Sequence, residues 1–273
     1  MRFDHAIWRG ARSIVRLGVL LETAGEYCAR VLVLRARGPV DLPARAQWLH
    51  ESCRAGLRRL KIGVEIQGRF PSRGLLVANH LSYLDILVLS GLAPCVFVAK
   101  KEVRSWPIFG LMARMAGTVF IDRSRSADAR RGNDQMLEVL SAGAVVVLFA
   151  EGTSSNGATV LPFRPALFEG AVQAGQPIAP AHLSYKVADG SVENDVCYWG
   201  SATFLPHLLR LLSRKGLRAS VRFAGAVRTF DDRKLAARET HKAVLALAGL
   251  APKRAEGSQV ADYSLASSSR NAE

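Results

Sequence analysis

The chain has 273 residues, of which 49% are hydrophobic and 22% charged. That balance is typical of a globular protein with a buried core and excludes a wholly disordered chain. The formal net charge is +14, which predicts an anionic partner such as phospholipid, nucleic acid or an acidic substrate. Because the basic residues are dispersed among apolar ones, as at Arg58 and Arg59 beside Leu60, we favour an anionic membrane surface over nucleic acid.

The N-terminal segment is apolar but carries charges along its length. Residues 14–34 include Glu22, Glu26 and Arg30, and each charge near the middle of a membrane span costs about 2.5–3.5 kcal/mol. We therefore expect an amphipathic helix that lies in the membrane interface rather than crossing it. The alternative is an ordinary amphipathic helix packed on the protein's own core. The expected apolar side comprises Leu17, Leu20, Leu21, Ala24, Cys28 and Val31.

After a break at Gly38-Pro39, a helix is predicted over residues 43–61 and a short strand over 64–66. Strands and helices then alternate. The run at 144–150 is apolar throughout, as in a central strand buried on both faces. Prolines in the run 177–183 indicate an edge strand or a strand start. The other predicted strands are 75–78, 96–99, 118–121 and 221–224, and the other predicted helices are 84–92, 109–115, 127–141 and 231–250.

This alternation predicts an α/β fold with a mixed, partly parallel sheet flanked by helices, preceded by an N-terminal amphipathic helical element for membrane association. We divide the chain into an N-terminal helical region (1–42), a main domain (43–250) and a tail (251–273) rich in Ser and Ala, which we expect to be disordered. We expect no cleaved signal peptide, because no clean apolar core precedes a small-residue cleavage site.

The strongest chemical segment is Asn79-His80-Leu81-Ser82-Tyr83-Leu84-Asp85, directly after a predicted buried strand. Ligands of open α/β sheets bind at the carboxyl ends of strands, and a histidine there is a candidate general base. If Ser82 begins the helix, Asp85 falls in its first turn and reaches back to the ring. A carboxylate in that place would fix the tautomer and stabilise the imidazolium. A purely structural role, in which Ser82 and Asp85 only cap the helix, is the alternative.

Other polar residues are predicted at neighbouring strand ends. Arg123 ends one predicted strand, and its planar guanidinium suits phosphate, while Lys100 ends the strand before it. Glu151-Gly152-Thr153 follows the run at 144–150, where the carboxylate could bond a substrate hydroxyl. Arg164 is a further candidate phosphate contact. A solvated basic edge and a plain turn are the structural alternatives for these residues.

Taken in order, these segments resemble the glycerolipid acyltransferase family, of the 1-acylglycerol-3-phosphate acyltransferase type. The resemblance covers roughly residues 48–225 and includes residues 177–180, which it implies help to shape a pocket. It implies that His80 removes the proton of an acceptor hydroxyl while Asp85 orients the ring. The hydroxyl then attacks the thioester of acyl-CoA or acyl carrier protein directly, without an acyl-enzyme.

The resemblance further implies phosphatidic acid as the product and the absence of cofactor and metal. The family's third block usually reads Phe-Pro-Glu-Gly-Thr-Arg-Ser, whereas Ala150 and Ser154 replace the proline and the arginine here. That departure weakens the case for a phosphate-bearing acceptor and makes O-acylation of lyso-ornithine lipid the alternative. The implied substrate-binding residues are Lys100, Arg123, Glu151, Gly152, Thr153 and Arg164.

Several rival classes lack their motifs. The sequence contains no Gly-x-Ser-x-Gly, His-Glu-x-x-His or Gly-x-Gly-x-x-Gly pattern, which argues against serine hydrolases, zinc hydrolases and dinucleotide enzymes. A non-enzymatic basic membrane-binding module is the remaining alternative. We expect a peripheral or monotopic protein at the cytoplasmic face of the cell membrane. Its expected partners are the anionic membrane surface, a lysolipid and the acyl donor, without nucleic acid.

Overall fold

The computed structural model describes residues 2–36, 38–106, 109–121 and 126–250. The strands are β1 (Gly63–Gln67), β2 (Gly74–Ala78), β3 (Val96–Lys100), β4 (Val119–Ile121), β5 (Val145–Phe149), β6 (Ile178–Lys186) and β7 (Arg218–Phe223). The helices are α1 (Arg2–Ala36), α2 (Leu42–Arg59), α3 (Leu84–Leu92), α4 (Phe109–Ala116), α5 (Ser126–Ser141), α6 (Glu169–Gln173), α7 (Val192–Asp195), α8 (Phe204–Ser213) and α9 (Arg233–Ala248), with short 3₁₀ helices η1 (Lys101–Ser105) and η2 (Pro165–Phe168).

The strands form a seven-stranded sheet in the order β1-β7-β6-β2-β5-β3-β4. Every neighbouring pair is parallel except β6 and β7, which run antiparallel. The predicted α/β class with a mixed, partly parallel sheet is therefore confirmed. Since β2, β5 and β3 are adjacent and parallel, their carboxyl ends meet at one edge of the sheet, where the predicted functional segments follow.

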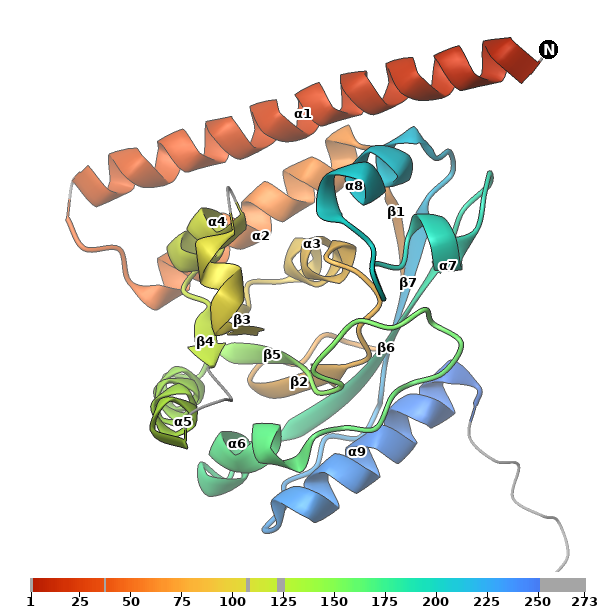
Figure 1. Ribbon diagram of the computed structural model, residues 1–273. Coiled ribbons are helices and arrows are strands. Elements are labelled where there is room, and N and C mark those ends of the chain that lie inside the picture. Colours follow the sequence, from red (N-terminus) through yellow and green to blue (C-terminus); the bar gives the residue numbers. More distant parts are fainter. Residues whose placement is uncertain (1, 37, 107–108, 122–125, 251–273) are drawn as a thin grey trace, which may run out of the picture.

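Helices cover both faces of the sheet, and successive residues of β2 point to opposite sides. Leu76 and Ala78 join an apolar cluster with α2 and α3, while Leu75 and Val77 join a second cluster with α5, α6 and α9. All four of these β2 residues are fully buried. In Figure 1, α2 and α3 lie on one side of the sheet and α6 and α9 on the other.

Of the two alternatives for the prolines in residues 177–183, the edge strand is wrong, because β6 lies between β7 and β2. Pro180 has no N–H to donate, but the ladder toward β7 is interrupted beside it. Ala181 pairs with Phe223, whereas Ile178 pairs with Arg228, two residues out of register. The proline therefore occupies a break in the ladder inside the sheet, and Pro177 precedes the strand start as predicted.

Helix α1 lies across the outside of the α2 and α8 layer, on the side of the molecule away from α9 (Figure 1). The side that we expected to meet the membrane mostly faces the protein: Val31 is fully buried, and Leu17 and Leu20 pack against the α8 cluster. Of that expected apolar side, only Leu21 is substantially exposed, at 48%. The alternative reading, in which this side packs on the protein's own core, is thus the observed one.

A different side of α1 is apolar and exposed. This side includes the small residues Gly18 and Ala29, and Glu22 is a charged residue within it. No helix in the described ranges is both long enough and apolar enough to cross a membrane. The large exposed apolar side chains of α1 are Trp8, Ile14, Val15, Leu21, Leu32, Val33 and Leu34.

Candidate active site

Asn79 ties the end of β2 to the neighbouring strand. Its side-chain nitrogen donates to the carbonyl oxygen of Leu183 at 3.0 Å, and its side-chain oxygen accepts from the N–H of Leu183 at 2.7 Å. The amide thus replaces a backbone pair just where β2 ends, and it is buried. The next residue, His80, is therefore presented at the carboxyl edge of the sheet from a fixed backbone.

His80 and Asp85 contact each other as predicted. Asp85 lies in the first turn of α3, and its Oδ2 is 2.8 Å from Nδ1 of His80. The same oxygen accepts from the backbone N–H groups of Leu81 at 2.7 Å and Ser82 at 3.0 Å. An ionised carboxylate only accepts hydrogen bonds, so the hydrogen of this contact is on Nδ1, and in the neutral imidazole the lone pair is then on Nε2.

The two side chains differ in their access to solvent. Asp85 is completely buried, whereas the His80 side chain retains 21% of its exposure. The His80 ring stacks on Phe149, the last residue of β5, with ring centroids 4.1 Å apart and planes 14° from parallel. The carboxylate and the phenyl ring together fix the imidazole, leaving its outer part accessible at the sheet edge.

Tyr185 is a member of this cluster that sequence reasoning missed. Its hydroxyl donates to Oδ1 of Asp85 at 2.6 Å, from an almost fully buried position on β6. Burial, together with the Asp85 charge, raises the pKa of Tyr185 well above its usual value, so the hydroxyl stays protonated and can act as a donor. The contact spans 100 positions of the chain, and it depends on β6 being the neighbour of β2.

Glu151 lies beside His80 but is turned toward the backbone. One carboxylate oxygen accepts from the His80 N–H at 2.8 Å and the other from the Leu161 N–H at 3.2 Å. The side chain is buried, and burial raises the pKa of Glu151 to about 7. The N–H of Ser155 also donates to the His80 carbonyl at 2.9 Å. The loop after β5 therefore holds the His80 backbone on both sides.

Of the remaining predicted residues, those that the structure describes lie at the same edge without entering this hydrogen-bond network. Lys100 is exposed at the end of β3, and Thr153 is exposed in the loop after β5. Gly152 is buried with a φ of 74°, a left-handed conformation that favours glycine. Arg164 is exposed, and its backbone N–H donates to Ala150 at 3.0 Å. Arg123 lies outside the described residues.

Ser154 occupies the position where the related block usually has arginine. Its hydroxyl donates to the carbonyl of Tyr198, and the N–H of Tyr198 donates to the Leu81 carbonyl at 2.8 Å. The short side chain is therefore used to join the loop after β5 to the segment before α8. Unlike arginine, it brings no positive charge to this edge of the sheet.

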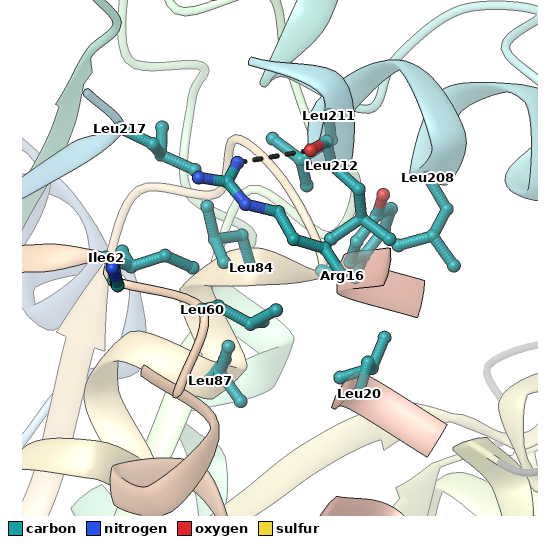
Figure 2. Close-up of a pocket in the computed structure, with 12 residues that line it drawn as sticks. Arg16, Leu20, Leu60, Ile62, Leu84, Leu87, Leu208, Leu211, Leu212 and Leu217 are labelled. Atoms are coloured by element: carbon teal, nitrogen blue, oxygen red, sulfur yellow. Dashed lines mark hydrogen bonds between the residues drawn. The ribbon is translucent and has the colours of Figure 1, made fainter. Parts of the chain in front are cut away.

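Residues close to His80 in the sequence line two cavities. An apolar cavity of about 80 Å³ lies between α1, α3 and α8 and includes Tyr83 and Leu84 in its wall. Figure 2 shows Arg16 among the residues that line this cavity, and its guanidinium donates to the carbonyl of Leu212 at 3.1 Å. A more open and more polar cavity of about 520 Å³ is lined by Asn79 and by His182.

His182 is not placed to share the chemistry of His80. Leu183 and Tyr185 belong to the cluster on the α3 side of the sheet, so His182 points to the opposite face, as successive residues in a strand do. Burial and the nearby Arg222 lower the pKa of His182 to about 4. The ring is therefore neutral near pH 7, and it lies away from the Asp85 carboxylate.

Comparison with known proteins gives the class of this site. Residues 61–184 match the family model described as Acyltransferase. A lyso-ornithine lipid O-acyltransferase of Brucella abortus is 39% identical over 188 residues, which cover 63% of this chain and 70% of that protein. The 1-acyl-sn-glycerol-3-phosphate acyltransferase of Neisseria gonorrhoeae is 38% identical, with 62% and 68% covered. The chain belongs to the acyltransferase family.

Within the family, the chain is similar both to relatives named for lyso-ornithine lipid and to relatives named for 1-acyl-sn-glycerol-3-phosphate. The lyso-ornithine lipid O-acyltransferase of Pseudomonas aeruginosa is 39% identical over 175 residues, and the chain spans 65% of its length. The fold also matches the crystal structure of the 1-acyl-sn-glycerophosphate (LPA) acyltransferase PlsC from Thermotoga maritima. That match has a TM-score of 0.63, 19% identity and coverage of 95% of this chain and 100% of the other, and it bears on the fold alone.

Proposed function

We propose that this protein transfers a fatty acyl group from a thioester to the free hydroxyl of a lysolipid. The observation that carries the proposal is the His80–Asp85 pair, a partly exposed imidazole whose Nδ1 is held by a buried carboxylate 2.8 Å away. Membership of the acyltransferase family supports it. The acyl donor in this proposal is acyl-CoA or acyl carrier protein, and no cofactor or metal takes part.

The proposed reaction is a single displacement at the acyl carbon. Nε2 of His80 takes the proton of the acceptor hydroxyl as its oxygen attacks the thioester carbonyl, and Asp85 stabilises the resulting imidazolium. The tetrahedral intermediate collapses with cleavage of the carbon–sulfur bond. The departing thiolate receives the proton from His80, so the products are an ester and a free thiol and no acyl-enzyme is formed.

The proposed acceptor side is the edge of the sheet around the loop after β5. In this arrangement Glu151 holds the loop, Gly152 allows its turn, and Thr153 faces the acceptor. Lys100 and Arg164, exposed at the same edge, would attract an anionic head group, and we assign Arg123 to the same role from the sequence alone. With these cations the first acceptor to test is 1-acylglycerol-3-phosphate.

Lyso-ornithine lipid is the second candidate acceptor. Ser154 stands where the related block usually carries arginine, and its hydroxyl is occupied by the Tyr198 carbonyl. The site therefore lacks one cation that a phosphate group would use. The similarity to lyso-ornithine lipid O-acyltransferases of four organisms supports the same choice.

The proposed place of action is the membrane surface, with α1 as the contact element. Its exposed side is mostly apolar, and its other side bonds to α8: Ser13 donates to the Leu209 carbonyl at 2.8 Å, and Arg12 to the Ser213 carbonyl at 2.6 Å. A helix that is bonded to the protein on one side and mostly apolar on its exposed side is suited to lie on lipid. The net charge of +14 adds attraction to anionic lipid. Because the thioester donors are cytoplasmic, we assign a peripheral or monotopic place on the cytoplasmic face.

The test is acyl transfer by the purified protein with 1-acylglycerol-3-phosphate and lyso-ornithine lipid offered side by side. We expect His80→Ala to lower kcat by about a thousandfold, because loss of a general base typically costs 10²–10⁴. The control is His50→Ala, which removes a ring on α2 that bonds to the Ser90 carbonyl and should leave turnover within about twofold. Full turnover by His80→Ala would overturn the mechanism. The preferred acceptor is the one with the larger kcat/KM in the wild-type protein.

A further inference from the structure

The Asp85 carboxylate has two oxygens with unequal surroundings. Oδ2 accepts three N–H groups, from the His80 ring and from the backbone of Leu81 and Ser82. Oδ1 accepts the hydroxyl of Tyr185 at 2.6 Å, and no other donor reaches it in the part of the chain that the structure describes. Since Asp85 is fully buried, water does not replace a missing partner, and the state of Oδ1 depends on Tyr185.

The position of Tyr185 is set by the same contacts that set His80. The side-chain amide of Asn79 pairs with both backbone groups of Leu183, which fixes β6 against the end of β2. Tyr185 lies two residues further along β6 and therefore points to the same face as Leu183, toward α3. Asn79, which precedes His80, is thus bonded to Leu183, which lies two positions from Tyr185. The phenol and the imidazole therefore reach Asp85 in a fixed geometry.

We propose that Tyr185 is a positioning residue of the active site, which holds the Asp85 carboxylate in the rotamer that accepts the Nδ1–H of His80 and limits its basicity. The inference rests on the proposed function. A donor on Oδ1 stabilises the negative charge, so the carboxylate attracts the imidazolium less strongly. Without that donor His80 would keep its proton to higher pH, and less of the free base would be present near pH 7.

The experiment is to compare Tyr185→Phe with the wild-type protein by steady-state kinetics across pH and by NMR titration of the His80 ring. We expect kcat at pH 7 to fall about tenfold with KM for both substrates within twofold, and the acidic limb of kcat/KM to move up by about 0.5–1 pH unit. The His80 ring resonance should titrate at correspondingly higher pH. The ring signal is needed because the Glu151 carboxyl and the Cys197 thiol also interact with the Asp85 charge, and the pKa of Glu151, about 7, lies in the same range.

A double-mutant cycle shows whether Tyr185 acts through Asp85. In an Asp85→Asn background, Tyr185→Phe should change kcat by less than twofold, because the carboxylate that it orients is gone. A full tenfold loss in that background would overturn the proposal. The matched control is Tyr27→Phe, which removes a phenol hydroxyl from the same apolar cluster and should leave the pH profile unchanged.

A second variant keeps the proposal testable if Tyr185→Phe fails to fold. Replacing Tyr185 by 3-fluorotyrosine preserves the ring and makes the hydroxyl a stronger donor, so the acidic limb should move to lower pH, opposite to the effect of Tyr185→Phe. A merely structural role predicts a lower melting temperature with unchanged pH dependence, which would contradict the proposal. If the wild-type protein acylates neither lysolipid but the His80 titration still shifts, the proposed function fails while the positioning role stands.

Discussion

At the residue scale, the candidate active site contains two buried carboxyl groups with different hydrogen-bond partners. Asp85 is surrounded by four donors, whereas Glu151 accepts two backbone N–H groups and is otherwise desolvated, which raises its pKa to about 7. A glutamate in the unfolded chain titrates near 4.5. Below that pH Glu151 is neutral in both states, so its burial carries no penalty for charge and the folded state is favoured. This contribution to stability is lost as the pH rises toward 7.

The resulting prediction concerns stability rather than catalysis. We expect the free energy of unfolding of Glu151→Gln, relative to the wild-type protein, to rise by about 2–3 kcal/mol between pH 5 and pH 8, because glutamine never carries the buried charge. Urea unfolding at both pH values measures the difference. The control is Glu65→Gln, at an exposed carboxylate on β1. Its free energy of unfolding relative to the wild-type protein should be the same at both pH values within about 0.5 kcal/mol. An unchanged difference for Glu151→Gln would show that the carboxylate is not destabilised by burial.

The sequence was sufficient to predict the contact between His80 and Asp85, because five positions separate them and the geometry of one helix turn decides whether they meet. Tyr185 could not be predicted in the same way. Its contact with Asp85 requires β6 to lie beside β2 and to present its odd-numbered residues to α3. Alternation along a strand shows which residues share a face, but it does not show which strand is the neighbour.

At the element scale, α1 is attached by arginines that cap the end of α8. Arg16 donates to the carbonyls of Leu212 at 3.1 Å and Arg214 at 2.5 Å, where a helix leaves carbonyl groups without intrahelical partners and its dipole is negative. Burial and the neighbouring Arg12 lower the pKa of Arg16. Arg16 also lines the apolar cavity beneath α1 (Figure 2).

We therefore expect Arg16→Met to loosen α1 from the body of the protein. Methionine keeps an apolar stem but leaves the α8 carbonyls without their donor, at a cost of about 1–3 kcal/mol. Hydrogen exchange of the α1 amides should speed up, while that of β2 and β5 stays unchanged. Arg30→Met is the control, since its bond to Glu26 is exposed and is worth at most about 0.5 kcal/mol. Equal exchange in the two variants would contradict a capping role for Arg16.

At this scale the sequence predicts the elements, but it does not predict which side of an element packs against which neighbour. Strand β5 was predicted because an unbroken apolar run is buried on both faces of a sheet. For α1, periodicity correctly indicated a helix, but both its sides carry apolar residues. Leu17, Leu20 and Val31 pack on the protein, and Ile14, Leu32 and others face outward. Sequence alone does not distinguish these two sides, because the first is buried partly by α8, which lies nearly 200 positions away in the chain.

At the scale of the whole molecule, charge and apolar surface are two separate reasons for membrane binding. The net charge of +14 acts over about a Debye length and weakens with salt. The exposed apolar side of α1 binds by burial in the lipid, and this contribution does not weaken with salt. In Figure 1, α1 and α9 lie on opposite sides of the molecule, so a substitution on α9 changes the total charge without touching the proposed membrane-facing surface.

This arrangement gives a charge-matched test. We expect the double substitution Leu32→Glu and Val33→Glu, at side chains that are 60% and 53% exposed, to lower the fraction of protein that sediments with anionic vesicles by about tenfold or more. Burial of two such side chains is worth roughly 1.5–3 kcal/mol each. Lys234→Glu, exposed in the first turn of α9, makes the same change of two charge units and should reduce sedimentation less than threefold. If the two variants lose binding equally, and both losses vanish in high salt, net charge rather than the α1 surface holds the protein on the membrane.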